Sequence, residues 1–383
     1  MYRKLSSSQI FTGYDTITDN QVLIVDSKGV IVDLVNAEDV GDGVEFHEGI
    51  ISPGFINCHC HLELSHLKEK IPKQTGLIDF LLKIVEQRFV DDETIQNAIK
   101  QAEAEMIQNG IVAVGDICNT NHTLEQKRKG KIYYQNFLEV SGFPKSIANQ
   151  RFEQIKKTFD EFSIHLNQNS IVPHAPYSVS TDLLKLIMEF QSNEIVTMHN
   201  QETIEENEFF KFKSGDFLRL YDQLKINIDS FTSQEKNSIV HFAPYFNREI
   251  NNILVHNVCT NKEDIDFLKE QYRSDFDRLY FCLCPNANQY ISNQMPSADL
   301  FLNENCNIVL GTDSLASNDE LSIWGEIKTL QKSNPQFSTT QLLKWATING
   351  AKALKIDHHF GSFEKGKNPG VILIKVDKVE VLV

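Results

Sequence analysis

The sequence predicts an α/β protein in two parts: a (β/α)8 TIM barrel and a small β-sandwich domain formed by both termini. Three observations predict this organisation. Between residues 50 and 359, short β-branched runs alternate with amphipathic helical segments, the pattern of repeated βα units and a parallel sheet. The two ends of the chain contain short strand-like runs instead. The chain has 383 residues and is 41% hydrophobic, which allows one barrel core and a small second unit.

The terminal domain is predicted from residues 1–49 plus 360–383. Gln21 to Asp26 and Val30 to Val35 are β-branched runs on either side of a glycine-containing turn, as in a hairpin. The last run, Gly370 to Val383, has the same character. We therefore expect the two ends of the chain to meet in one β-sandwich.

Eight apolar runs are the candidate strands of the barrel, predicted over residues 50–359. The clearest helix between them is Glu93 to Gln108, with Asp91 or Asp92 as its cap. An open, doubly wound sheet is the alternative, but no GxGxxG follows the first strand to indicate a dinucleotide site. The runs are Ile50–His61, Gly110–Cys118, Lys131–Gly142, Ser170–Val179, Ile195–Glu202, Asn252–Thr260, Leu279–Asn286 and Asn307–Ser314.

A long insertion interrupts the regular spacing between the fifth and sixth runs. Thr203 to Asn247 has helical character and is rich in Phe and Glu. Insertions after barrel strands usually lie at the face that carries the chemistry. We therefore expect the segment at about 203–247 to cover the active site.

Composition excludes several classes of protein. A net charge of −15 argues against a nucleic-acid partner, which needs a basic surface. No run approaches the ~18 apolar residues of a membrane span, and the polar start MYRKLSSSQI does not resemble a secretion signal. The seven cysteines mostly lie in apolar runs, where a thiol is a small buried side chain. These features predict a soluble, cytoplasmic protein without a membrane partner.

Metal-competent and acid–base side chains follow four of the candidate strands. In a strand, residues two apart face the same side, so His59 and His61 can both face one ion. Any one of these side chains could be structural, but the carboxyl ends of barrel strands meet at one catalytic face. We therefore predict one shared site. Its residues are His59 and His61 after the first strand, His199 and Glu202 after the fifth, His256 after the sixth and Asp313 after the eighth.

The motifs around these residues resemble the amidohydrolase superfamily over essentially the whole chain. They are PGFINCHCHLE, HNQE, LVHN and GTDS, in that order. HNQE, together with VPHAPYSVS at Val172–Ser180, resembles the deaminase and chlorohydrolase (ATZ/TRZ-like) branch. LCPNAN at Leu283–Asn288 resembles the HxPxSN-like seventh strand of that branch, although Leu283 replaces the leading histidine.

The resemblance implies one divalent metal ion, with His59, His61, His199 and Asp313 as its ligands. Binuclear members bridge two ions with a carboxylated lysine on the fourth strand, and Ser170–Val179 contains no lysine. Zinc is the expected ion, with iron or manganese as alternatives, since all three occupy histidine–carboxylate sites. The unrelated zinc deaminases with HxE and PCxxC motifs are excluded because the sequence has no CxxC.

The resemblance also implies the catalytic residues Glu202, His256 and Asp313. Asp313 would accept a proton from the attacking water, and Glu202 would protonate the ring nitrogen beside the aminated carbon. His256 would orient the attacking oxygen or stabilise the developing oxyanion.

Three further residues are candidate substrate contacts. His174 is better placed for the substrate than for the metal. Glu63, on the first loop, could contact the substrate, and Arg88 could bind an anionic or ribosyl group. Solvated residues at these two positions are at least as common.

The expected function is hydrolytic deamination of an aminated nitrogen heterocycle. The segments HLELSHL and HAPYS resemble enzymes for an adenosine-type nucleoside such as aminodeoxyfutalosine, which is the favoured small-molecule substrate. The alternatives are a chlorohydrolase, a cyclic amide hydrolase, a guanine- or cytosine-type base deaminase, or a non-catalytic relative. The last would be expected to lose metal ligands, and this sequence retains all of them. The resemblance also implies a homodimer.

Overall fold

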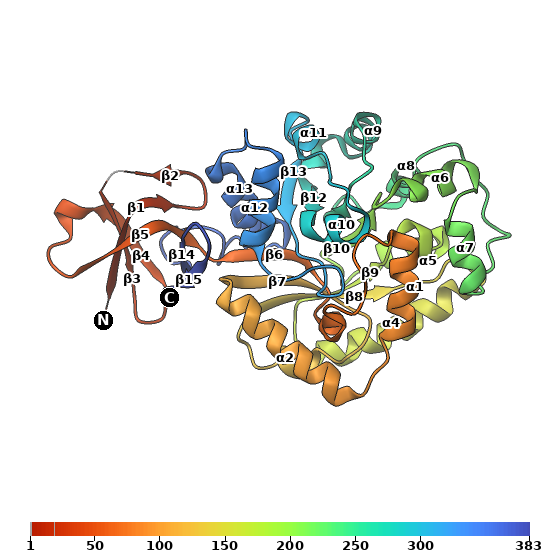
Figure 1. Cartoon of the computed structure of the whole chain (residues 1–383), viewed down its shortest axis with the longest axis horizontal. Helices are drawn as coiled ribbons and strands as arrows, with labels where there is room; N and C mark the ends of the chain where they lie inside the picture. Colours follow the sequence, from red (N-terminus) through yellow and green to blue (C-terminus); the bar gives the residue numbers. More distant parts are fainter. Residues whose placement is uncertain (1, 19) are drawn as a thin grey trace.

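The computed structural model describes residues 2–18 and 20–383 and has a mixed α/β fold with parallel sheets. Figure 1 shows a sheet that contains both chain ends at one side of the molecule. A larger body of parallel strands and helices lies beside it.

The two chain ends form one seven-stranded sheet in the order β15-β14-β5-β1-β3-β4, with β2 paired to β1. Strand β5 joins the two ends, because it pairs with β1 in parallel and with β14 in antiparallel orientation. Leu5, Leu23 and Leu373 belong to a separate apolar core on this sheet. The strands are β1 (Arg3–Phe11), β2 (Thr16–Ile17), β3 (Gln21–Val25), β4 (Ile31–Asn36), β5 (Val44–Pro53), β14 (Val371–Ile374) and β15 (Val379–Val381).

This strand pairing describes a single sheet. The two stacked faces of the predicted β-sandwich, and the domain boundaries at 1–49 plus 360–383, therefore stay predictions. Strand β5 continues across the predicted boundary at residue 50, so the terminal sheet leads directly into the larger body.

Eight parallel strands form two four-stranded sheets, β6-β7-β8-β9 and β10-β11-β12-β13, and each overlaps one of the predicted runs. Helices cover such strands, so both faces are apolar. Backbone hydrogen bonds join the sheets at both margins. His199 N donates to His174 O (2.9 Å), and the amides of Thr312 and Asp313 donate to His59 O (3.1 and 3.0 Å). The strands are β6 (Phe55–Cys60), β7 (Ile111–Cys118), β8 (Tyr133–Val140), β9 (Asn169–Pro173), β10 (Ile195–Asn200), β11 (Asn251–His256), β12 (Leu279–Leu283) and β13 (Asn307–Leu310).

Helices with side-chain caps connect the parallel strands. Asp91 caps α2 by accepting a hydrogen bond from Thr94 N at 2.9 Å, so this helix begins one residue before the predicted Glu93. Within the described part of the chain, no helix has both the length and the apolar character needed to cross a membrane. The helices are α1 (Leu77–Gln87), α2 (Asp92–Gln108), α3 (Leu124–Lys127), α4 (Ala148–Ser163), α5 (Thr181–Met188), α6 (Ile204–Phe212), α7 (Phe217–Gln223), α8 (Ser238–Phe242), α9 (Lys262–Tyr272), α10 (Pro285–Ser292), α11 (Ala298–Asn303), α12 (Ile323–Ser333), α13 (Thr339–Ala346) and α14 (Ile348–Ala353).

Short 3-10 turns lie between these elements. They are η1 (Ala37–Asp39), η2 (Leu62–Leu67), η3 (Lys145–Ile147), η4 (Pro176–Ser178), η5 (Ala243–Tyr245) and η6 (Arg273–Arg278).

The segment predicted as an insertion at about 203–247 contains α6, α7, α8 and η5. Its interior is aromatic: the rings of Phe209 and Phe231 stack with centroids 4.7 Å apart. Arg219 of α7 pairs with Asp79 of α1 at 2.7 Å. This contact holds the segment beside the helix that follows the first parallel strand.

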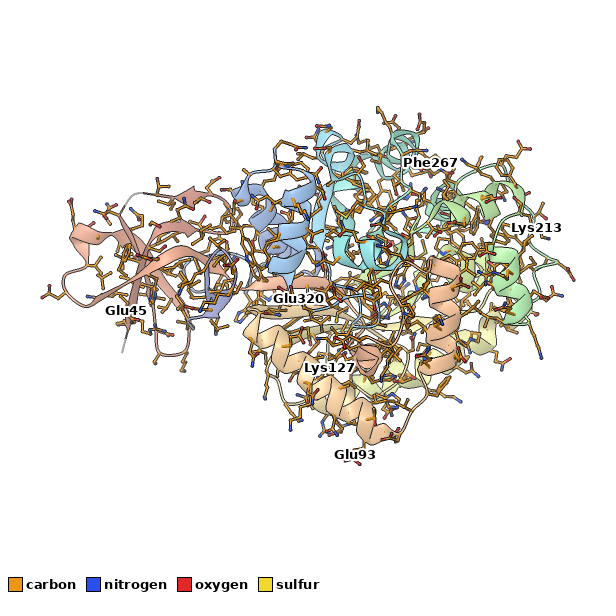
Figure 2. All side chains as sticks on the ribbon, in the orientation of Figure 1. Glu45, Glu93, Lys127, Lys213, Phe267 and Glu320 are labelled. Atoms are coloured by element: carbon orange, nitrogen blue, oxygen red, sulfur yellow. The ribbon has the colours of Figure 1, made fainter. Side chains whose placement is uncertain are left out.

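A buried ion pair connects the turn after β6 to the neighbouring strands. Nζ of Lys127 lies 2.5 Å from Oδ2 of Asp116, and both side chains are fully shielded from water. Lys127 also donates to Asn136 Oδ1 at 2.9 Å, while Asp116 Oδ1 accepts the amide of Leu62 at 2.8 Å. In Figure 2, Lys127 lies within the larger body, whereas Glu93 lies at its edge.

We predict that Lys127→Met lowers the free energy of unfolding by about 3–5 kcal/mol, because it leaves the buried Asp116 carboxylate without its partner. Chemical denaturation measures this loss. The control is Lys156→Ala, which removes the exposed Lys156–Asp160 pair and is expected to cost about 0.5 kcal/mol or less. A loss no larger for Lys127→Met than for the control would contradict the prediction.

Candidate metal and substrate site

Four metal-competent side chains converge where the parallel strands end. His59 lies on β6 and His61 directly after it, His199 lies on β10, and Asp313 follows β13. All four residues are more than nine-tenths buried. Gly311 allows this approach, since a Cβ there would lie 2.8 Å from the Cβ of His59.

The geometry of this cluster fits a metal ion. Its ligand atoms all lie within 4.8 Å of one another. His61 Nε2 is 3.2 Å from His59 Nε2 and 3.3 Å from His199 Nε2, and Asp313 Oδ1 is 3.4 Å from His61 Nε2. Nδ1 of His199 donates to the carbonyl of His174 at 2.7 Å, so the Nε2 of this neutral ring carries a lone pair towards the cluster.

The protonation states favour the same conclusion. Burial lowers the pKa of His59 and of His61 well below the usual value, so both rings are neutral, the form that binds metals. Burial alone would raise the pKa of Asp313. The neighbouring His61 and His256, together with Ser317 Oγ donating to Oδ2 at 2.6 Å, instead bring that pKa below its usual value. Three neutral imidazoles and one carboxylate suit one divalent ion.

Left-handed backbone occurs at three of the strand ends that meet here. Its φ angles are 46° at Gln201, 74° at His256 and 56° at Asp313. Non-glycine residues adopt this conformation uncommonly, and such strain concentrates at functional sites. At each of these positions the chain changes direction directly after the polar side chain has been placed in the site.

Glu202 and His256 lie beside the metal-competent cluster. His256 Nε2 is 3.7 Å from Glu202 Oε1, and its ring stacks on that of His199 with centroids 5.4 Å apart. The side-chain amide of Asn288 lies 3.1 Å from His256 Nδ1. Burial, reinforced by Asp313 and Glu206, raises the pKa of Glu202 well above its usual value, which favours the protonated form of this carboxyl.

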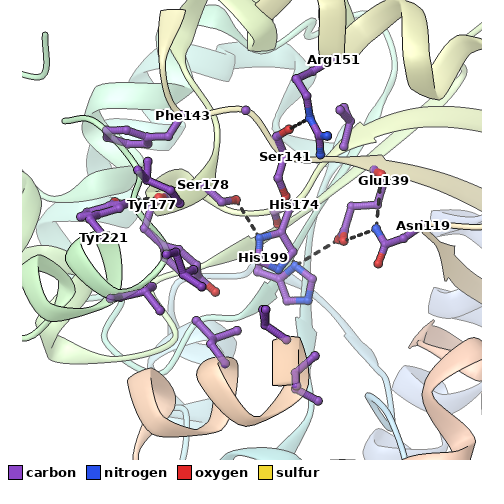
Figure 3. A pocket seen from close by; sticks show the side chains of 18 of the residues that line it. Asn119, Glu139, Ser141, Phe143, Arg151, His174, Tyr177, Ser178, His199 and Tyr221 are labelled. Carbon is purple, nitrogen blue, oxygen red and sulfur yellow. Dashed lines mark hydrogen bonds and ion pairs between the residues drawn. The ribbon is translucent and has the colours of Figure 1, made fainter. Parts of the chain in front are cut away.

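A cavity of about 920 Å³ opens from the cluster. Its inner end is polar and includes Glu202, His256 and Asp313. In Figure 3, His174 and His199 lie between an aromatic side with Tyr177 and Tyr221 and a polar side with Asn119 and Glu139. Much of the outer wall is apolar and contains Leu77, Phe80 and Ile84 of α1 with Leu220, Tyr221 and Leu224 from the 203–247 segment, while Arg151 and Lys225 are charged members of the same lining.

The three predicted substrate contacts differ in their placement. His174 and Arg88 line the cavity. The carboxylate of Glu63 is engaged elsewhere: it accepts from Arg88 at 3.1 Å and from the amides of Asn119 and Thr120, each at 3.1 Å. Glu63 thus holds Arg88 and the loop after β7, and its direct contact with a substrate stays a prediction.

Glu139 lines the same cavity but was not predicted. It lies near the end of β8, so the pattern that identified the other residues, an ionisable side chain at the end of an apolar strand, also marks this position. Asn119 Nδ2 donates to its Oε2 at 2.9 Å. Ser317, which holds Asp313, was also missed, because a serine four residues after an aspartate has no distinctive sequence signal.

Known proteins share this fold and sequence. The model of the Amidohydrolase family matches residues 50–382. A 5-methylthioadenosine/S-adenosylhomocysteine deaminase of Thermoanaerobacter pseudethanolicus is 26% identical over 86% of this chain and 74% of its own length.

Two solved structures have the same fold. The aminofutalosine deaminase of Helicobacter pylori in complex with methylthio-coformycin has a TM-score of 0.83 at 21% identity, over 98% of this chain and 93% of that one. An adenosine deaminase of Xanthomonas campestris with bound zinc has a TM-score of 0.72 at 19% identity, over 98% of this chain and 84% of that one. The family match, which spans most of the sequence, confirms the resemblance seen in the motifs: the chain belongs to the amidohydrolase family.

Proposed function

We propose that this protein is a metal-dependent hydrolytic deaminase of an adenosine-type nucleoside. The observation that carries the proposal is the position of Glu202, a buried carboxyl with a raised pKa, 3.7 Å from His256 and beside the His–Asp cluster. Attack of water on an aminated aromatic carbon needs a proton donor at the adjacent ring nitrogen. The Thermoanaerobacter relative, named for two adenosine-type substrates, supports the same activity.

We propose His59, His61, His199 and Asp313 as ligands of one divalent ion. Imidazole and carboxylate suit zinc, and iron or manganese can occupy the same donors. When bound, such an ion supplies the positive charge that lowers the pKa of water towards about 7.

The proposed protein steps begin with two proton transfers. The carboxyl of Glu202 protonates the ring nitrogen, while Asp313 takes one proton from the water whose oxygen bonds to the ring carbon. The C–N bond then breaks, and ammonia leaves with the proton held by Asp313. Glu202 recovers a proton from the new hydroxyl as the carbonyl forms. His256, held by Asn288, orients the attacking oxygen.

The shape of the cavity supports a substrate larger than a free base. A volume of about 920 Å³ suits a nucleoside with a large 5′ substituent, such as aminodeoxyfutalosine, and the lining includes Phe80 and Leu220 as well as the cations Arg151 and Lys225. We also propose that the eight parallel strands close into a (β/α)8 barrel. The backbone hydrogen bonds from His199 to His174, and from Thr312 and Asp313 to His59, join the two four-stranded sheets and support this closure. It takes the 203–247 segment as a cover over the site, since Leu220 and Tyr221 line the cavity. A homodimer stays a prediction from the resemblance.

A screen of metal-loaded protein for ammonia release, with loss of substrate followed in parallel by chromatography, tests the activity. The panel contains adenosine, 5′-deoxyadenosine, 5-methylthioadenosine, aminodeoxyfutalosine, guanine, cytosine, a cyclic amide and a chlorotriazine. We expect ammonia from the adenosine-type compounds. Turnover confined to the free bases, the cyclic amide or the chlorotriazine would replace the proposal with the matching alternative.

We predict that His199→Ala reduces bound metal from about one ion per chain to a small fraction, because the site would lose one of its four proposed protein ligands. Elemental analysis after dialysis measures the content. The matched control is the exposed His165→Ala, which should retain the wild-type content. Equal metal in both variants would remove His199 from the ligand set.

For Glu202→Gln we expect kcat to fall roughly 10²–10⁴-fold, because the amide cannot supply the proton. Metal content should not change. Glu205→Gln, at a partly exposed position in the first turn of α6, is the control and should retain activity. Wild-type turnover by Glu202→Gln would exclude this carboxyl as the acid.

A further inference from the structure

One carboxylate oxygen in the cavity wall lacks a hydrogen-bond partner within the described structure: Oε1 of Glu139. The residue is only 5% exposed, and its other oxygen is held by Asn119. The nearest ring nitrogen, His199 Nδ1, lies 3.6 Å away but gives its proton to the carbonyl of His174. A buried carboxylate oxygen without a donor is costly, so the missing donor is expected from a ligand.

The cations and donors around Glu139 are already committed. Arg88 donates to Glu63 at 3.1 Å, and its contact with Asn119 Oδ1, at 3.4 Å, orients that amide. The side-chain amide of Asn119 faces Oε2 of Glu139. Oε1 therefore remains available on the cavity side.

His174 shares this part of the wall. A ring nitrogen of His174, one of His199 and a carboxylate oxygen of Glu139 lie within 4.8 Å of one another. Nδ1 of His174 contacts Ser178 Oγ at 2.7 Å, which fixes the ring and leaves Nε2 for a ligand. An acceptor-only carboxylate and an imidazole thus stand side by side, a pair that suits two neighbouring hydroxyl groups, since each hydroxyl can both donate and accept.

We infer that Glu139 is a substrate-binding residue that accepts a hydrogen bond from a sugar hydroxyl, with His174 at the adjacent hydroxyl. This inference rests on the proposed function, because it places the ribose at this wall when the base lies beside Glu202 and His256. Glu139 and His174 both lie against the ring of His199, so they are next to the proposed reaction centre. The 5′ substituent then points to the apolar outer wall.

The consequence is selectivity for an intact ribose. A site that buries a polar group for a substrate hydroxyl disfavours the analogue that lacks it, because the protein group is then left unpaired.

The test compares deamination of adenosine, 2′-deoxyadenosine, 3′-deoxyadenosine and 2′,3′-dideoxyadenosine by the zinc-loaded full chain. For the wild type we expect kcat/KM to be ~10–100-fold higher for adenosine than for the dideoxy compound. Glu139→Met, of similar length but without an acceptor, should reduce this ratio to about threefold or less, mainly by slowing adenosine. The more conservative Glu139→Gln should give an intermediate ratio.

A matched control is Glu103→Gln, a buried carboxylate outside the cavity that accepts a hydrogen bond from Tyr134 at 3.1 Å. Its ratio should equal that of the wild type. Metal content and melting temperature are measured for every variant, so that a loss of ligands or of folding is recognised.

The outcomes separate this inference from the proposed function. Equal kcat/KM for all four nucleosides in the wild type would overturn the role of Glu139 and leave the deaminase intact. An equal slowing of all four by Glu139→Met would also overturn it, since Glu139 would then act only through His199 or Asn119. No ammonia from any of the four would overturn the proposed function and this inference together.

Discussion

Three imidazoles and one carboxylate share a space from which water is largely excluded, and the surrounding architecture serves to hold them there. The amides of Thr312 and Asp313 bind the carbonyl of His59, so the first and last parallel strands are fixed at the point where their side chains meet. The left-handed backbone at Asp313 would be unfavourable in an isolated loop. Within the site it is stabilised by the hydrogen bonds of its neighbours, including Ser317.

A chain of hydrogen bonds links this centre to the substrate wall. Glu63, in the turn after β6, holds Arg88 and the loop at Asn119, and Asn119 in turn holds Glu139. Glu63, two residues after His61, therefore helps to place the carboxyl group of Glu139 on a different strand. This polar network joins the loop beside the His–Asp cluster to the wall of the cavity.

Local patterns explain why much of the fold and the cluster could be predicted. The strands β6, β10, β11 and β13 are short apolar runs with an ionisable side chain at or just after their carboxyl ends, and the parallel arrangement brings these ends together whatever the intervening loops contain. Contacts between distant residues could not be predicted in this way. The Lys127–Asp116 pair, the strand order within the sheet of both termini and the engagement of Glu63 with Arg88 all depend on tertiary pairing that leaves no periodic signal in the sequence. Glu139 was missed for another reason. Its position near the end of an apolar strand fits the pattern of the other site residues, but only the unpaired Oε1 seen in the structure distinguishes it from a structural residue.

The path of β5 has a consequence for how the chain is assembled. This strand pairs with residues 371–374 and leads through Gly54 into β6, which carries His59. During synthesis, β5 can pair with β1 at once, but its pairing with β14 must wait until residues 371–374 have left the ribosome. A deletion that removes β14 would leave one edge of β5 unpaired, and β5 leads directly into β6, which carries His59. The pairing of β5 with β14 therefore forms only after His59 and His61 have been synthesised.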